Sequence, residues 1–221
     1  MTALSRRIEF WVVVTVAFGY FIAGSVWAAW FAQPSDDLAF SDASVIGMVL
    51  VELVLFALLA PLLWWRGWRP EALGLGFTWQ DVGVGCALFL ACIISASLLM
   101  TGLALMAGGM GTLWERMEGA PLSMAAIVAV SIVNPIFEEV FVCGYVIRAL
   151  QRTRSIAFAV NASVAIRVSY HLYQGAIGAL GVAVVGLILG WWFARKGRLW
   201  PVIIAHGLMD LVALLGFGMG Y

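Results

Sequence analysis

Seven segments of mostly apolar residues, each about 20 residues long, occupy most of this 221-residue chain. A helix of that length crosses the hydrocarbon core of a bilayer, where the backbone must satisfy its own hydrogen bonds. The sequence therefore predicts an all-α membrane protein, a polytopic bundle of about seven transmembrane helices. The predicted spans are residues 10–32, 43–65, 82–106, 121–148, 156–173, 176–194 and 199–218.

The composition supports this class of protein. Hydrophobic residues make up 64% of the chain and charged residues only 11%, whereas a soluble domain carries about 25% charged residues. The formal net charge is zero, which gives no reason to expect a nucleic-acid partner. We therefore expect one transmembrane domain over residues 1–221, surrounded by membrane lipid.

Basic residues are concentrated in alternate loops between the predicted spans. Cytoplasmic loops of membrane proteins carry an excess of Lys and Arg, and this bias predicts the orientation of the bundle. It places the N-terminus in the cytoplasm and the C-terminus outside, in the plasma (inner) membrane. The predicted cytoplasmic side holds ten of the twelve Lys and Arg residues, namely Arg6, Arg7, Arg66, Arg69, Arg148, Arg152, Arg154, Arg195, Lys196 and Arg198.

Five polar residues lie inside the apolar segments: Glu138, Glu139, His171, His206 and Asp210. They include both histidines of the chain. A carboxylate or imidazole at membrane depth costs several kcal/mol unless it is paired or used, so each of the five is a candidate for a functional site. Together they predict a buried hydrolytic or metal site.

Glu138 and Glu139 follow Pro135 in the fourth span. Neighbouring residues of a helix are about 100° apart around its axis, so the two carboxylates cannot both point in one direction. One can face a reacting centre while the other supports it. Glu52, in the second span, is a further carboxylate for which the sequence offers no partner, and packing or a polar pathway explains it better than catalysis.

Each histidine has a charged residue one helical turn away. Arg167 and His171 are four residues apart, and so are His206 and Asp210, which puts each pair on one face of a helix. The guanidinium of Arg167 cannot be neutralised, so it must pair with a carboxylate of the set. For His171 to reach the depth of the other site residues, we expect the fifth helix to begin late in its span, near Asn161.

Charge balance leaves two kinds of chemistry open. Ionised Glu138, Glu139 and Asp210 carry three negative charges, and Arg167 carries one positive charge. One divalent metal ion or two protons would neutralise the remaining two charges. A metal ion would activate water, and a glutamate that binds a proton would act as a general base. The residues alone do not choose between these.

The polar residues fall into three short motifs on three spans: Glu138-Glu139-Val-Phe-Val-Cys143, Arg167-Val-Ser-Tyr-His171 and His206-Gly-Leu-Met-Asp210. They resemble the motifs of the CPBP family of intramembrane proteases, also called the type 2 CAAX prenyl endopeptidase or abortive-infection (Abi) family. That family shows Glu-Glu-x-x-x-Arg, then Phe-x-x-x-His, then His-x-x-x-Asn/Asp. The resemblance covers the motif-bearing core, residues 121–215.

Two positions depart from the family pattern. Cys143 stands in place of the motif arginine, and Arg167 stands in place of the motif phenylalanine. We interpret this exchange as a relocated guanidinium, which pairs with Glu139 from the neighbouring helix. The chain would then belong to a variant subgroup, and the alternative is a degenerate site without protease activity.

The resemblance implies an intramembrane (metallo)endopeptidase. It implies that Glu138 activates the attacking water with help from His171, and that His206 and Asp210 bind metal or stabilise the oxyanion. If a metal is bound, the expected cofactor is one divalent ion, preferably zinc, with His171, His206 and Glu138 as ligands. The expected substrate is a membrane-associated peptide or protein that is cleaved near the cytoplasmic leaflet.

Two other classes of function remain open. A non-catalytic membrane scaffold or immunity-type protein could retain the protease fold, and then Glu138→Ala would leave its function intact. A haem protein could use His171 and His206 as axial ligands on different helices, and it would be coloured when purified.

Overall fold

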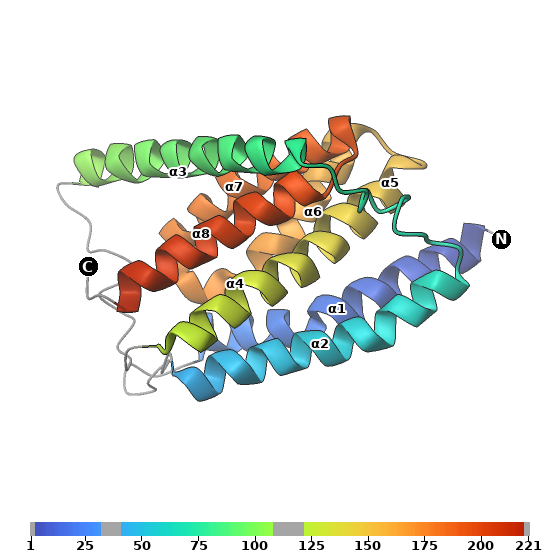
Figure 1. The fold of residues 1–221 in the computed structure, drawn as a ribbon, viewed down its shortest axis with the longest axis horizontal. Coiled ribbons are helices and arrows are strands. Elements are labelled where there is room, and N and C mark those ends of the chain that lie inside the picture. Colours follow the sequence, from blue (N-terminus) through green and yellow to red (C-terminus); the bar gives the residue numbers. More distant parts are fainter. Residues whose placement is uncertain (1–2, 32–40, 108–121, 219–221) are drawn as a thin grey trace.

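The computed structural model describes residues 3–31, 41–107 and 122–218, and every regular element in these ranges is helical. Figure 1 shows the long helices side by side in one bundle. The predicted all-α fold is thereby confirmed. The elements are α1 (Ala3–Trp30), α2 (Asp42–Trp65), α3 (Gln80–Ala107), α4 (Met124–Glu139), the π-helix η2 (Val140–Ile147), α5 (Arg148–Gln151), α6 (Ile156–Ser169), the 3-10 turn η3 (Leu172–Gln174), α7 (Gly175–Lys196) and α8 (Trp200–Gly218).

Each predicted span has a helix in its place. Ile156–Ser169 and Trp200–Gly216 are apolar but short, and α4, η2 and α5 follow one another without a break as Met124–Gln151. Within the described ranges, five stretches are long and apolar enough to cross a membrane: Ser5–Trp30, Asp42–Trp65, Gln80–Leu103, Met124–Gln151 and Leu172–Lys196.

The span Met124–Gln151 is the central helix of the bundle. In its most apolar part 67% of the residues are buried, compared with 17–28% in the other four long spans. Its α4 part packs against α2 and α8, and its η2 part packs against α6 and α7. Every residue of η2 is buried. Buried π-helical turns are frequent at functional sites, and this one begins directly after Glu139.

Helix α8 lies directly on the backbone of α4. Pro135, inside α4, has no N–H group, so it cannot donate to the carbonyl oxygen of Ser131 one turn earlier. A Cβ atom built on Gly207 would lie only 2.7 Å from that oxygen. Glycine at position 207 is therefore needed for the close approach, and it brings the neighbouring His206 to the central helix.

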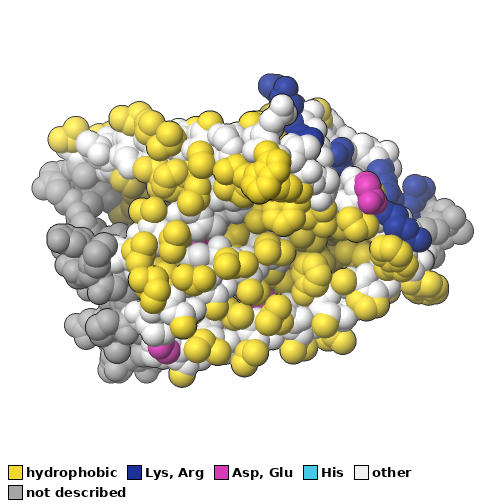
Figure 2. All heavy atoms as spheres, viewed as in Figure 1, with side chains coloured by type: hydrophobic (Ala, Val, Ile, Leu, Met, Phe, Trp, Pro, Cys, Tyr) yellow, Lys and Arg dark blue, Asp and Glu magenta, His cyan; other side chains and the backbone are white. Residues whose placement is uncertain are grey.

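Apolar side chains cover the face of the bundle seen in Figure 2, and Lys and Arg side chains gather at one end. This end contains the start of α1, the last turn of α2, α5 and the turn between α7 and α8 (Figure 1). We call it the basic end. It carries the ten Lys and Arg residues that the sequence assigns to one side of the membrane.

Two turns interlock at the basic end. Gly74 and Gly197 both have a positive φ, 85° and 70°, and the N–H of Leu199 donates to the Gly74 carbonyl oxygen at 2.8 Å. Beside them, Arg198 forms an ion pair of 2.6 Å with Asp81 at the start of α3. These contacts fix the turn between α7 and α8, and so the start of α8.

The start of the fifth helix differs from the prediction. Helix α6 begins at Ile156, with the side chain of Ser155 as its N-cap, and Asn161 lies inside the helix with its amide bonded to the helix backbone. The prediction of a late start was therefore wrong, because the serine cap comes first. His171 instead comes near the other site residues because α6 ends early, at Ser169, after 14 residues.

Candidate functional site

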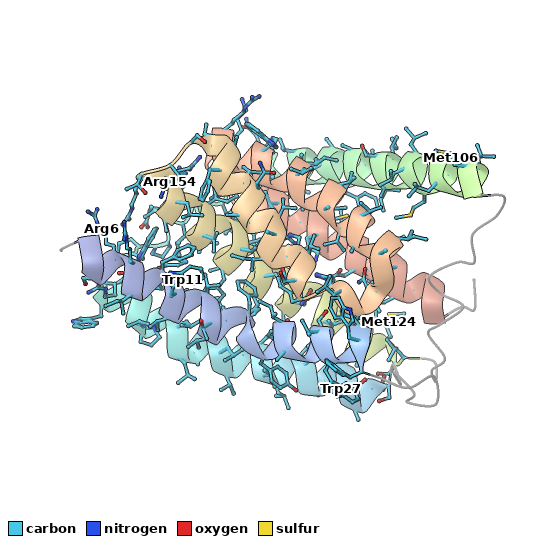
Figure 3. The ribbon with its side chains drawn as sticks, turned by 180° about the vertical axis from the view of Figure 1, so that it is seen from behind. Arg6, Trp11, Trp27, Met106, Met124 and Arg154 are labelled. Atoms are coloured by element: carbon cyan, nitrogen blue, oxygen red, sulfur yellow. The ribbon has the colours of Figure 1, made fainter. Side chains whose placement is uncertain are left out.

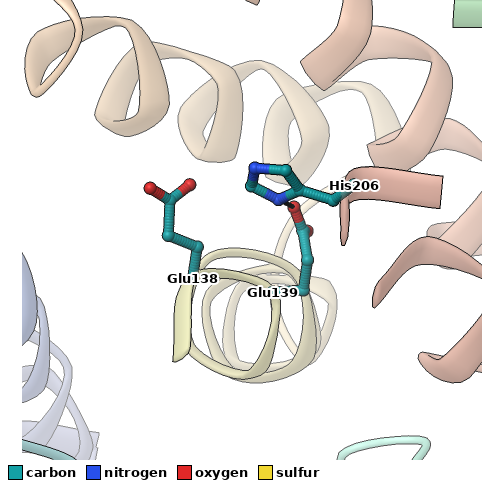
Figure 4. A group of neighbouring side chains, drawn as sticks. All are labelled: Glu138, Glu139 and His206. Atoms are coloured by element: carbon teal, nitrogen blue, oxygen red, sulfur yellow. Dashed lines mark hydrogen bonds and ion pairs between the residues drawn. The ribbon is translucent and has the colours of Figure 1, made fainter. Parts of the chain in front are cut away.

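Glu139 is the most enclosed residue of the site. Its side chain is fully buried, and Arg167 Nη2 lies 2.6 Å from its Oε1 and 2.7 Å from its Oε2. His206 Nδ1 donates a third hydrogen bond, to Oε1, at 2.7 Å (Figure 4). The ion pair of Arg167 with Glu139 is the one predicted from the sequence. Both oxygens of Glu139 are thereby engaged, so this carboxylate holds its neighbours in place.

Arg167 reaches Glu139 from α6 because small residues leave room for it. Cys143, four residues after Glu139 on the central helix, is a small residue that is buried. On α7, a Cβ atom built on Gly186 would lie 3.3 Å from Arg167 Cδ. The guanidinium beside Glu139 therefore comes from α6 and not from the central helix.

Glu138 is held more loosely than Glu139. Tyr170 donates its hydroxyl proton to Glu138 Oε2 at 2.7 Å, and Asn134 Nδ2 donates to Oε1 at 3.2 Å. Arg167 Nη1 is 3.4 Å from Oε2, a longer contact. Figure 4 shows the two glutamates leaving the central helix on the same side, with their carboxylates apart. Glu138 therefore keeps lone pairs for a further partner.

His206 lies between two carboxylates. Its Nδ1 donates to Glu139, and its Nε2 is 3.5 Å from Asp210 Oδ1, four residues on along α8. A protonated imidazole can donate from both nitrogens, so this arrangement suits the imidazolium form. Asp210 is the more open of the two carboxylates, with 24% of its side chain exposed.

His171 lies in the turn that follows α6. Its Nδ1 donates to the carbonyl oxygen of Arg167 at 2.9 Å, which leaves Nε2 as the nitrogen with a free lone pair. Its ring lies against that of Tyr170, with centroids 4.6 Å apart. Unlike Arg167 and His206, it forms no direct bond with a described carboxylate.

Asn134 joins a second buried carboxylate to the site. Its Nδ2 donates to Glu52 Oε1 at 2.7 Å as well as to Glu138. Glu52 is only 1% exposed, so α2 contributes a carboxylate to a site that the sequence assigned to three other spans. Three buried oxygens have no hydrogen-bond partner among the described residues: Glu52 Oε2, Ser131 Oγ and Asp210 Oδ2.

The sequence analysis did not select Tyr170 and Asn134. Asn134 lies four residues before Glu138, the spacing that puts both on one helix face, and this signal could have found it. Tyr170 lies next to His171, but an aromatic residue in an apolar span reads first as a packing or interface residue. In the structure the Tyr170 ring stacks on Phe18, with centroids 5.1 Å apart, while its hydroxyl bonds to Glu138.

Glu138, Glu139 and His206 form a group that could hold a metal ion, because one donor atom from each lies within 4.8 Å of the others. His171 is not in this group, so the group differs from the ligand set predicted from the sequence. Both oxygens of Glu139 already bind Arg167, and both nitrogens of His206 face carboxylates. A metal ion at these donors would compete with the Arg167 guanidinium for the negative charge of Glu139, and His206 would have to give up a ring proton to bind it.

Comparison with known proteins finds a family match over the helices that carry this site. Residues 120–212 match the model of the family described as type II CAAX prenyl endopeptidase, Rce1-like. No curated protein and no solved structure matches the chain. The matched segment runs from the start of the central helix to just beyond Asp210, and it contains all six residues predicted for the site. Over this segment the chain is similar to the Rce1-like, type II CAAX prenyl endopeptidase family.

Proposed function

We propose that the chain is an intramembrane endopeptidase that cleaves a peptide bond of a membrane-associated substrate, with Glu138 as the base that activates water. The observation that carries this proposal is the unequal position of the two glutamates. Arg167 contacts both oxygens of Glu139 at 2.6–2.7 Å, whereas it contacts Glu138 once, at 3.4 Å, and the other two donors to Glu138 are neutral. A carboxylate that is less tightly paired than its neighbour suits general-base activation of water. The family match supports the same class of reaction.

In the proposed reaction, Glu138 takes a proton from water while the water oxygen attacks the carbonyl carbon of the substrate. His171 assists through Nε2, because its Nδ1 proton is bonded to the Arg167 carbonyl oxygen. Glu138 then gives the proton to the leaving nitrogen as the carbon–nitrogen bond breaks. Tyr170 and Asn134 hold the carboxylate in position during both transfers.

His206 is proposed to stabilise the oxyanion that forms on the substrate carbonyl. Its Nδ1 is fixed by the 2.7 Å bond to Glu139, whereas its Nε2 has only the 3.5 Å contact with Asp210. The longer contact is the one that a new acceptor can replace, so Nε2–H would donate to the developing negative charge. Asp210 keeps the ring oriented and favours its protonated form.

The proposed mechanism uses Arg167 as the permanent cation of the site and includes no step through a metal ion. We further propose that the bundle lies in the plasma (inner) membrane with its basic end on the cytoplasmic side, following the excess of Lys and Arg there. The haem alternative is not favoured, because His206 has carboxylates at both ring nitrogens.

The test compares the parent protein with Glu138→Gln, which keeps the size of the side chain but cannot accept the proton. Each variant is reconstituted in liposomes with a detergent extract of bacterial membrane proteins, and new peptide N-termini are identified by mass spectrometry. The matched control is Glu71→Gln, at an exposed glutamate of the basic end. We expect cleavage products from the parent and the control but none from Glu138→Gln. Products that persist in Glu138→Gln would reject Glu138 as the base, and an inactive parent would favour the scaffold alternative.

A further inference from the structure

A cavity of about 540 Å³ opens at the basic end, away from the site described above. It lies between the start of α1, the end of the central helix and the start of α6. Its charged lining comes from Arg6, Arg7, Arg152 and Arg154, and part of its apolar lining from Trp11 and Phe158. Figure 3 shows Arg6 and Arg154 at the same end of the bundle, opposite to Met106.

The four arginines of this cavity have no anion to neutralise them within the described residues. None of them forms an ion pair there, and the one carboxylate that lines the cavity, Glu9, is already engaged. Glu9 accepts hydrogen bonds from Arg66 Nε at 2.7 Å, from Trp68 Nε1 at 2.8 Å and from the Tyr145 hydroxyl at 3.2 Å. The positive charge around the cavity is therefore open to a ligand.

Two of the arginines are held over aromatic rings at the cavity. The Arg152 guanidinium lies 4.2 Å from the centre of the Trp68 ring, and that of Arg154 lies 5.3 Å from the Phe158 ring. Stacking of this kind leaves the N–H groups at the edge of a guanidinium free to donate. Guanidinium groups bind phosphate oxygens with charge-assisted hydrogen bonds, often two at a time.

The other wall of the cavity is apolar and exposed. Trp11 is 65% exposed and lies four residues after Arg7 on α1, and Phe158 is 50% exposed and lies four residues after Arg154, which precedes α6. An aromatic side chain at the boundary of an apolar span suits contact with lipid chains. The cavity is thus lined by exposed arginines on one part and by exposed aromatic side chains on another.

We propose that this cavity binds the phosphate group of an anionic membrane lipid, with the acyl chains lying along Trp11 and Phe158. Basic pockets between transmembrane helices bind anionic lipid headgroups. The charge of the cavity selects against a zwitterionic lipid, whose cationic group would meet the same arginines. The exposed aromatic side chains favour a lipid over free phosphate, because phosphate has no apolar part that could contact Trp11 and Phe158. The site joins α1 to the turn between α5 and α6 and does not depend on peptidase activity.

The proposal is tested by titrating the delipidated full-length protein in mild detergent with short-chain phosphatidylglycerol and measuring bound lipid by native mass spectrometry. Phosphatidylcholine with the same chains and inorganic phosphate are the comparison ligands. The variant is Arg152→Gln with Arg154→Gln. The control is Arg195→Gln, an exposed arginine that stacks on Trp191 outside the cavity. A further variant, Ala149→Phe, fills the cavity without a change of charge.

We expect the parent protein to bind phosphatidylglycerol in preference to phosphatidylcholine. Loss of two arginines should weaken binding about 30-fold, because each basic residue near a headgroup contributes about 1 kcal/mol to the binding free energy. Ala149→Phe should also weaken binding, and Arg195→Gln should not. Equal binding of the two lipids, an equal loss in Arg195→Gln, or displacement of the lipid by millimolar phosphate would each overturn the proposal. Because bound lipid is measured directly, the result is independent of whether the protein cleaves peptides.

Discussion

Arg167 is the residue whose removal tests the structure of the site most directly. Loss of one partner from a buried ion pair costs about 3–5 kcal/mol, because the other charge remains buried without compensation. Glu139 is fully buried but retains the 2.7 Å hydrogen bond from His206, so Arg167→Phe should cost about 3 kcal/mol, the lower end of that range. For a chain of this length, 1 kcal/mol corresponds to about 2–4 °C, so the melting temperature should fall by about 6–12 °C.

The assay is a thermal melt of purified protein in one detergent, followed by tryptophan fluorescence. Arg195→Gln, an exposed arginine on α7, is the control and should leave the melting temperature unchanged. In the double variant Cys143→Arg with Arg167→Phe, a guanidinium returns to the central helix beside Glu139, and part of the lost stability should return. Cys143→Arg alone should destabilise, since it buries a second positive charge beside Arg167.

The result that would refute this reasoning is an absence of coupling between the two positions. If Cys143→Arg changes the melting temperature equally in the parent and in Arg167→Phe, the two guanidinium positions do not share Glu139 as a partner. An unchanged melting temperature in Arg167→Phe would reject the stabilising ion pair itself.

Three further predictions follow from the packing and charges of the site. Gly207→Ala should destabilise the protein by about 1–3 kcal/mol in the same melt, because its Cβ would meet the Ser131 carbonyl oxygen at 2.7 Å; Gly216→Ala, with nothing within 4 Å, is the control and should not. Asn134→Leu should lower peptide cleavage by about 10-fold or more through loss of the hydrogen bond that orients Glu138, with unchanged substrate binding. A chelator should leave cleavage unchanged, whereas loss of activity that zinc restores would show that a metal replaces the guanidinium.

The helical bundle could be predicted from the sequence because a long apolar segment in a membrane must satisfy its own backbone hydrogen bonds, which a helix does. The partner of Arg167 could be predicted for a similar reason, since a charge that cannot be neutralised must find an anion. The start of α6 was mispredicted because depth was inferred from the position of His171, whereas Ser155 caps the helix earlier and the early end at Ser169 sets the depth. The partner of Glu52 depends on how α2 packs against α4, and no local pattern contains that information.

The contact of Gly207 with the Ser131 carbonyl oxygen has a mechanical consequence. Because backbone lies against backbone, the separation of α4 and α8 at this point leaves no room for a side chain between them. The turn between α6 and α7 is different: a Cβ atom built on Gly175 would meet nothing within 4 Å, and the turn is tied to α1 by the hydrogen bond from the Tyr173 N–H to Ser25 Oγ. The spacing between the glutamates on α4 and His206 on α8 is therefore set by contact between two backbones, whereas the position of His171 depends on a turn held by side-chain contacts.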